Sequence, residues 1–143
     1  MTDGSLNESK SILSKHDGLL YVGVLRQRRD FLNVQNKGVR LVMPHFILKA
    51  AMAQPSTIRP AISHRAGITA SRKVGNAVAR NRAKRRMRAL LRRLDPTHSP
   101  FSTDYVLVAR HSLVRAGWAE LTTDFSKAAK RIHKKLYEVA VQG

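Results

Sequence analysis

Hydrophobic and polar positions repeat with two different periods along this chain, and each change of period marks an expected element. Helical spacing is clearest in residues 76–94 and 118–136, where apolar side chains recur every three or four positions. A shorter helix is expected over residues 28–36. Alternation or short apolar runs predict strands in residues 39–53 (interrupted at Met43 and Pro44), 65–71 and 105–110.

The order of these elements is helix, strands, basic helix, strand, helix, which is typical of an α+β fold. We expect a small two-layer sandwich in which helices pack against a sheet of about four strands. Residues 105–110 are apolar on both faces and should form a central strand. Residues 21–140 would make a single domain, and residues 1–20, which lack sustained periodicity, would be a flexible tail.

The helix of residues 76–94 combines an apolar stripe with an otherwise basic surface. Gly75 ends the preceding extended segment, and Asn76 can cap the helix by accepting from a backbone N–H of the first turn. The stripe that would anchor the helix consists of Ala79, Ala83, Met87, Leu90, Leu91 and Leu94. The basic residues of the segment 71–94 are Arg72, Lys73, Arg80, Arg82, Lys84, Arg85, Arg86, Arg88, Arg92 and Arg93.

These like charges have no carboxylate among them. A solvated charged face is the ordinary fate of a charge run, but side chains three or four residues apart on a helix repel one another when their charges match. Phosphate groups would supply the missing anions. The segment therefore predicts a phosphate-binding surface, and the question is which polyanion it holds.

Composition supports a polyanionic partner. The chain has 143 residues and a formal net charge of +18, yet 43% of its residues are apolar. These values indicate a folded nucleic-acid binder or a protein bound to a large anionic scaffold. The chain has no cysteine, which fits a reducing compartment. Without an apolar run of about 20 residues or an evident signal peptide, we expect a cytoplasmic protein with no membrane partner.

The residue types needed for catalysis are scattered. Asp30 and Asp104 lie near expected elements but far apart in sequence, and the six histidines show no spacing typical of metal ligands. Gly75 stands alone, so no glycine-rich phosphate loop is present. We expect no catalytic residue and no metal site in this chain, although it could be part of an enzyme.

Several single side chains allow two interpretations. Capping explains Asn76, whereas Asn81 is a poor helix former between two arginines and favours a polar contact to nucleic acid. Phe31 and Phe46 could stack on unpaired bases or pack in the core. Trp118 lies on the apolar stripe of the last helix and is expected in the core with Phe125.

Residues 65–85 read RAGITASRKVGNAVARNRAKR and resemble the signature of the protein subunit of bacterial ribonuclease P, including Arg80, Asn81 and Arg82. The flanks agree, since Arg29, Asp30 and Phe31 are similar to the family's first helix and residues 104–110 to its late strand. The resemblance spans about residues 24–136.

The resemblance implies one RNA-binding α+β domain that acts with a large catalytic RNA. That RNA performs the metal-dependent removal of the 5′ leader from precursor tRNA. The expected partners are the catalytic RNA subunit and precursor tRNA, with no DNA. No cofactor is expected on the protein alone, and magnesium is implied for the RNA-catalysed reaction. The residues expected to bind RNA are Arg72, Lys73, Asn76, Arg80, Asn81, Arg82, Lys84, Arg85 and Arg88.

The resemblance also implies that a groove between the first helix and the sheet holds the single-stranded leader. The residues expected there are Phe31, Gln35, Ile47, Lys49, Thr69 and Ser71. Well-known members carry a second aromatic at the place of Gln35, and an aromatic is common at the place of Lys49. Charge and hydrogen bonding are therefore expected to take over part of the role of base stacking.

Two rival functions remain at this point. A self-sufficient nuclease would cleave RNA without a partner. A ribosomal or architectural RNA-binding protein would bind RNA but have no role in tRNA maturation.

Overall fold

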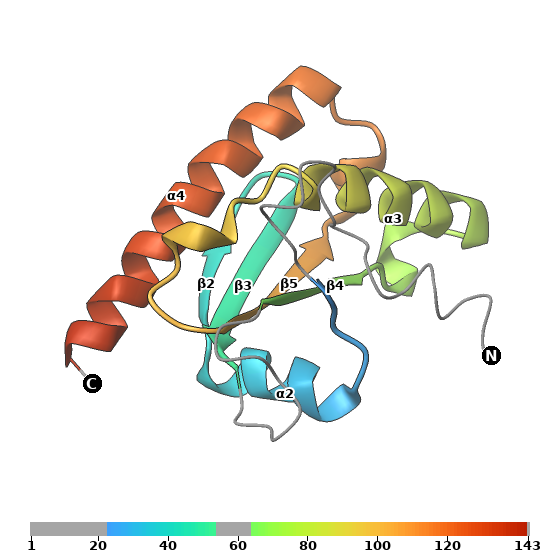
Figure 1. The fold of residues 1–143 in the computed structure, drawn as a ribbon. Helices are drawn as coiled ribbons and strands as arrows, with labels where there is room; N and C mark the ends of the chain where they lie inside the picture. Colours follow the sequence, from blue (N-terminus) through green and yellow to red (C-terminus); the bar gives the residue numbers. More distant parts are fainter. Residues whose placement is uncertain (1–22, 54–63, 143) are drawn as a thin grey trace.

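The computed structural model describes residues 23–53 and 64–142, which form a five-stranded sheet with helices on both faces (Figure 1). The strands lie in the order β1-β4-β5-β3-β2. Their bounds are Gly23–Val24 for β1, Val39–Val42 for β2, Phe46–Met52 for β3, Arg65–Thr69 for β4 and Thr103–Ala109 for β5. The helices are α2 (Arg28–Lys37), α3 (Ala77–Leu91) and α4 (Trp118–Gln142), with short 3-10 turns η1 (Arg72–Val74), η2 (Pro96–His98) and η3 (His111–Val114).

The central strand is β5, which pairs antiparallel with β3 and parallel with β4. It is buried along almost its whole length, as predicted from its two apolar faces. The strands β2 and β3 are antiparallel and flank Met43 and Pro44. Proline cannot donate to a strand ladder, so it lies in the turn between the two strands.

The helices α3 and α4 both lie over one face of the sheet, and α2 lies on the other (Figure 1). The main core fills the space under α3 and α4, where both helices contribute apolar stripes against Phe46, Tyr105 and Leu107. A smaller cluster under α2 contains Leu25, Val34, Ala51 and Val106, with Phe31 and Val108 at its edge.

The predicted α+β class is confirmed, and the sheet has five strands where about four were expected. The additional strand is β1, whose two residues are too few to show a period. β1 pairs parallel with β4. The Gly23 N–H donates to the His64 carbonyl at 2.8 Å, and the Leu25 N–H donates to the Ala66 carbonyl at 2.9 Å. α2 adds a partial layer on the second face. The flexible tail predicted for residues 1–20 lies outside the described residues.

A buried ion cluster joins α2 to the sheet. Arg65 begins β4, and its guanidinium donates to both carboxylate oxygens of Asp104 on β5, with Nε–Oδ1 at 3.1 Å and Nη2–Oδ2 at 2.8 Å. Its Nη1 also lies 3.3 Å from Oδ2 of Asp30 on α2. The side chain of Asp104 is fully buried and that of Asp30 is 5% exposed. Both carboxylates therefore need the compensating charge that Arg65 provides.

A second polar contact under α4 involves His133. Its Nε2 lies 2.8 Å from the buried hydroxyl of Tyr105, and the two rings meet edge to face. Burial is the main cause that lowers the pKa of His133 to about 4, and the neighbouring His98 lowers it further. His133 is therefore neutral in the folded protein at neutral pH.

We predict that Arg65→Met destabilises the protein by about 3 kcal/mol, because it removes the cation that contacts both buried carboxylates. Urea unfolding monitored by circular dichroism measures the change. The control is Arg28→Met, which removes an exposed arginine from the same region and should alter stability by less than about 0.5 kcal/mol. Equal unfolding midpoints for the two variants would contradict the assigned role of the ion cluster.

We also predict that His133 makes stability depend on pH. The unfolded histidine has a pKa of about 6.5, so below that value the unfolded chain binds a proton that the folded chain resists. The contribution of His133 is complete above pH 6.5 and is lost as the pH falls toward 4. In unfolding titrations, His133→Gln should flatten this part of the stability curve, whereas His111→Gln, at an exposed histidine, should leave it unchanged. The prediction would be refuted if the wild type, His133→Gln and His111→Gln gave parallel curves of stability against pH.

Candidate nucleic-acid interface

The helix α3 presents a buried apolar side and an exposed basic side. Ala83, Met87, Leu90 and Leu91 are fully buried, and Leu94 follows them just beyond the helix. Asn76 caps the helix as predicted, since its Oδ1 accepts from the Ala79 N–H at 2.9 Å. The anchoring stripe is thus confirmed from Ala83 to Leu94, while Ala79 is only half-buried. The basic residues of the helix are directed to the surface or to its edges.

The residues Arg80, Asn81 and Arg82 have different environments. Arg80 is half-buried, and its Nη1 donates to the Gly75 carbonyl at 3.3 Å, which ties the helix to the turn before it. Asn81 and Arg82 are exposed. The structure therefore gives Arg80 a contact within the protein and leaves the other two side chains available to a partner.

The outer line of α3 is formed by Asn81, Arg85, Arg88 and Arg92, which follow one another at spacings of three or four residues. Arg85 and Arg92 are exposed, while Arg88 and the neighbouring Lys84 are half-buried. Among the described residues, none of these cations forms an ion pair with a carboxylate. Their mutual repulsion is uncompensated within this part of the chain, so the helix surface carries an excess of positive charge.

The turn before α3 extends the basic surface. Arg72 and Lys73 in η1 are exposed, and the Ser71 hydroxyl accepts from the Lys73 N–H at 3.3 Å. Gly75 closes this turn with φ of 145°, a conformation that residues with a Cβ rarely adopt. Ser71 therefore has a capping role, and the glycine allows the chain to reverse into α3.

Arg86 has a structural role that the sequence did not suggest. Its Nη1 donates to the carbonyls of Leu113 and Val114 at 2.9 and 2.8 Å, and its Nη2 to that of Ala116 at 2.7 Å. Its guanidinium also lies 5.8 Å from the centre of the Trp118 ring. The prediction that Trp118 belongs to the core was wrong: Trp118 is 41% exposed because it begins α4, where Arg86 contacts its ring. Phe125, two turns later, is buried as predicted.

The second face of the sheet is only partly covered by α2. Strand register brings Thr69, Val108, Ile47 and Val42 into one row across this face. The next row contains Gly67, Val106, Lys49 and Arg40. Ile47, Lys49 and Thr69 are half-buried, and Arg40 and Val42 are exposed. Gly67 and Val106 are buried beneath α2, and we call the accessible remainder of the two rows the open sheet face.

Arg40 is a candidate that sequence reasoning missed. It lies directly opposite Lys49 in the antiparallel pair of β2 and β3. Like charges in such a pair are destabilising, so an anion over this position would relieve their repulsion. The relevant signal is strand register, which the sequence pattern alone does not specify.

Phe31 lies at the edge of the open sheet face. Its ring is so close to Gly67 that a Cβ built there would fall 2.5 Å from the ring edge, so β4 needs glycine at this point. Phe31 is half-buried and packs on the small cluster under α2, and Gln35, one helical turn later, is exposed. Phe46 is fully buried in the main core, which excludes a stacking role for it.

The structure thus brings most predicted residues together on two surfaces. The basic surface of η1 and α3 contains Arg72, Lys73, Asn76, Arg80, Asn81, Arg82, Lys84, Arg85 and Arg88. The open sheet face contains Ile47, Lys49 and Thr69, with Phe31 and Gln35 on the adjoining α2. Ser71 lies beyond the end of β4, at the start of the basic surface. The end of β4 therefore connects the two surfaces.

The described residues contain neither a membrane-spanning helix nor a metal-binding cluster. No helix in residues 23–53 or 64–142 is long and apolar enough to cross a membrane. Within the same ranges, no three His, Asp or Glu side chains lie together as they would around a metal ion. The carboxylates of Asp30 and Asp104 do converge, but both of them contact Arg65.

Comparisons with known proteins agree with this arrangement. A family model described as Ribonuclease P matches residues 23–133. The chain is 38% identical over 108 residues to the ribonuclease P protein component of Paramagnetospirillum magneticum, covering 76% of this chain and 80% of the relative. It is 37% identical over 108 residues to that of Erythrobacter litoralis, covering 76% and 84%.

Solved structures show the same similarity. The RNase P protein from Thermotoga maritima is 29% identical, with a TM-score of 0.60, and the match covers 76% of this chain and 96% of that one. The RNase P protein of Staphylococcus aureus is 22% identical, with a TM-score of 0.59 over 76% and 95% of the two chains, and bears on the fold alone.

Proposed function

The chain belongs to the family of ribonuclease P protein components, and we propose that its two surfaces bind two different RNAs. Proteins of this family are accessory subunits of the endoribonuclease that matures the 5′ end of tRNA. In our proposal the basic surface of η1 and α3 holds the catalytic RNA subunit. The open sheet face holds the single-stranded 5′ leader of precursor tRNA.

The uncompensated charge on α3 is the observation that supports binding of the catalytic RNA subunit to the basic surface. Asn81, Arg82 and Arg85 are exposed on a helix whose other side is anchored in the core. A folded RNA presents phosphates along a rigid surface, and arginine binds them through paired N–H groups. Asn81 adds a donor and an acceptor that can contact bases or ribose hydroxyls.

The open sheet face supports the second half. It offers the cations Arg40 and Lys49 for leader phosphates, and the apolar Ile47 and Val108 for the bases between them. Phe31 presents a half-buried ring at the edge of this surface, and Gln35 can exchange hydrogen bonds with a base. The leader would pass from this face to the start of α3, where the cleavage region of the RNA would lie.

The chemistry would belong to the RNA partner. When bound to that RNA, magnesium supplies the activated water and stabilises the leaving oxygen. The residues of this chain bind and orient the two RNAs, and none is assigned a proton transfer. The family match does not favour the alternative of a ribosomal or architectural RNA-binding protein.

The first test concerns α3. Removing one phosphate contact reduces the salt dependence of binding, so Arg82→Ala should lower the slope of log K against log salt for the catalytic RNA by about 0.9. Filter binding at several salt concentrations measures the slope. The control is Arg115→Ala, which removes an exposed arginine after η3. If both variants keep the wild-type slope, Arg82 does not contact the RNA.

The second test concerns the open sheet face. One variant should increase the stability of the free protein and decrease the salt dependence of precursor tRNA binding. Arg40→Gln should stabilise the free protein by about 0.2–1 kcal/mol, because it relieves the repulsion with Lys49. The same variant should lower the salt slope of precursor tRNA binding to the holoenzyme by about 0.7, the value for one single-strand phosphate. Binding of mature tRNA, which has no leader, should not change. A weaker affinity for both tRNAs would contradict leader recognition at this face.

A further inference from the structure

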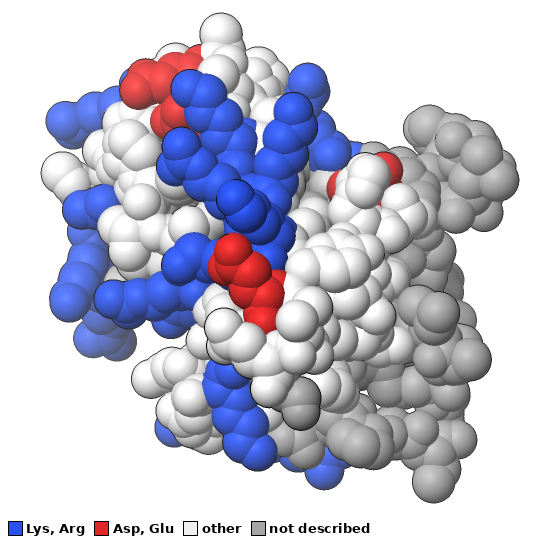
Figure 2. Space-filling model, turned by 90° about the vertical axis from the view of Figure 1, so that its left-hand side faces the viewer, with Lys and Arg blue, Asp and Glu red and all other residues white. Residues whose placement is uncertain are grey.

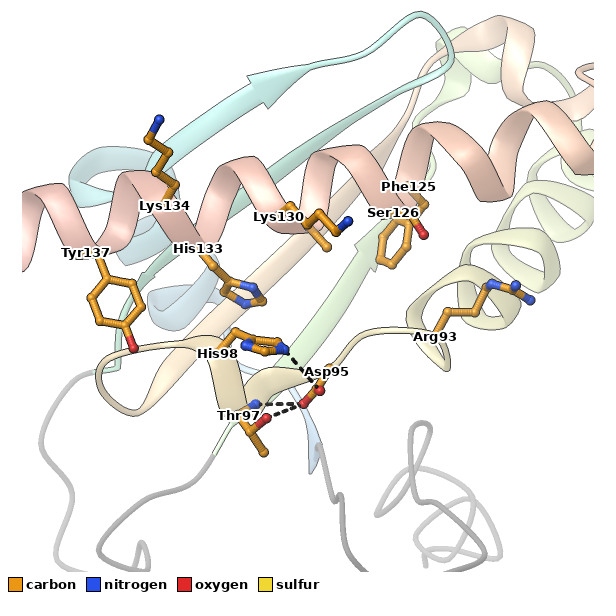
Figure 3. Close-up of a pocket in the computed structure, with 11 residues that line it drawn as sticks. Arg93, Asp95, Thr97, His98, Phe125, Ser126, Lys130, His133, Lys134 and Tyr137 are labelled. Atoms are coloured by element: carbon orange, nitrogen blue, oxygen red, sulfur yellow. Dashed lines mark hydrogen bonds and ion pairs between the residues drawn. The ribbon is translucent and has the colours of Figure 1, made fainter.

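A pocket of about 490 Å³ lies between α4 and η2, on a part of the molecule that neither proposed RNA surface uses (Figure 3). It is open on one side. Figure 3 shows the ring of Tyr137 at one end, Arg93 toward the other and the imidazoles of His98 and His133 between them. The remaining lining residues are Asp95, Thr97, Phe125, Ser126, Ala129, Lys130 and Lys134.

The floor of the pocket offers hydrogen bonds and no free cation. His133 contacts Tyr105 through Nε2, while its Nδ1 has no hydrogen-bond partner in the described part of the chain. Its lowered pKa of about 4 keeps the ring neutral at neutral pH. Asp95 accepts from the N–H and hydroxyl of Thr97 and lies 3.4 Å from His98 Nε2. A carboxylate in this position disfavours a phosphate on the floor and is compatible with a neutral group that carries N–H donors.

The rim of the pocket is cationic. Arg93, Lys130 and Lys134 are exposed, and none forms an ion pair with another described residue. Lys130 and Lys134 belong to the outer side of α4, which also carries Lys127, Arg131 and Lys135. Figure 2 shows basic side chains crowded over the face that α4 presents, with only small acidic areas among them. Phosphates that flank a group bound in the pocket would therefore lie close to the cations of the rim.

The walls of the pocket include aromatic surface. Tyr137 is 49% exposed, and its ring stands at one end of the pocket. His98 is exposed, and its ring centre lies 6.2 Å from that of His133. Planar bases stack on such rings with little dependence on sequence. The pocket therefore combines a stacking wall, a neutral polar floor and a cationic rim.

We propose that this pocket binds one unpaired nucleotide of an RNA strand. The base stacks on Tyr137 and contacts the His98 and His133 rings, and the flanking phosphates lie against Lys130 and Arg93. The proposal rests on the proposed function only in taking RNA as the partner. The pocket includes Arg93, which lies two residues beyond the C-terminal end of α3, while Asn81 and Arg82 lie in the first half of that helix. Asn81 and Leu91, the last residue of α3, are about 15 Å apart along the helix axis, so the two sites would contact separate parts of the bound RNA.

The test compares Tyr137→Ala with Tyr137→Phe in the reconstituted system. If a base stacks on the ring, the alanine variant weakens RNA binding about tenfold and the phenylalanine variant retains the wild-type affinity. One arm measures assembly with the catalytic RNA subunit, and the other measures precursor tRNA binding to the assembled holoenzyme. Loss in the first arm assigns the nucleotide to the catalytic RNA, and loss in the second assigns it to the precursor.

Two matched controls accompany this comparison. Val141→Ala truncates another exposed apolar side chain of α4, and it should bind like the wild type. Lys130→Gln should lower the salt slope by roughly 0.7–0.9, whereas Arg115→Gln, outside the pocket, should not. Urea unfolding of each variant verifies that the fold is retained. A local readout is the NMR signal of the His98 and His133 rings, which should shift when hexaadenylate is added to the wild type and remain in place with Tyr137→Ala.

The proposal is overturned if Tyr137→Ala binds within twofold of the wild type in both arms and the histidine signals do not move. It is also overturned if Tyr137→Phe is as weak as Tyr137→Ala, since stacking then has no part in binding. Arg82→Ala is measured in parallel. If Arg82→Ala weakens assembly while the pocket variants do not, the pocket proposal fails and the proposed function stands. If Arg82→Ala also has no effect, the proposed function itself fails.

Discussion

The apolar anchoring of α3 is the interaction on which the rest of this protein depends. Met87, Leu90, Leu91 and Leu94 are essentially inaccessible to solvent, and burying each such side chain contributes roughly 1.5–3 kcal/mol. A repulsive pair of charges on a helix surface costs about 0.2–0.5 kcal/mol. Burial therefore outweighs the repulsion, and the helix can keep an uncompensated basic side. Arg86 reinforces the anchor by binding three carbonyls between Leu113 and Ala116.

The placement of acidic residues complements this arrangement. Asp30 and Asp104 are buried and contact Arg65, so their charges hold α2 against the sheet instead of neutralising the surface. Because α2 is short, it covers only part of that face, so Ile47, Lys49, Thr69 and Val108 are only half-buried and Arg40 and Val42 are exposed. Because these two carboxylates are buried, the surfaces of α3 and of the open sheet face carry no exposed acidic residue in the described part of the chain.

The sequence predicted the features that depend on local periodicity. The helical stripe, the Asn76 cap and the central strand all follow from spacings within one segment, and each is present in the structure. Features that depend on register or on long-range packing were missed. The pairing of Arg40 with Lys49, the convergence of Asp30 on Arg65 and the contact of Phe31 with Gly67 each join residues whose alignment no single segment encodes. The Trp118 error has a related cause, because the apolar stripe does not reveal where α4 extends beyond the core.

The central claim is that this chain holds RNA and that the RNA carries out the cleavage. The most direct measurement is precursor tRNA cleavage at low magnesium by the purified protein, by the catalytic RNA subunit and by both together. We predict no cleavage by the protein, little by the RNA at that magnesium concentration, and efficient removal of the 5′ leader by the mixture. Cleavage by the RNA-free protein, or a mixture no more active than the RNA alone, would contradict it.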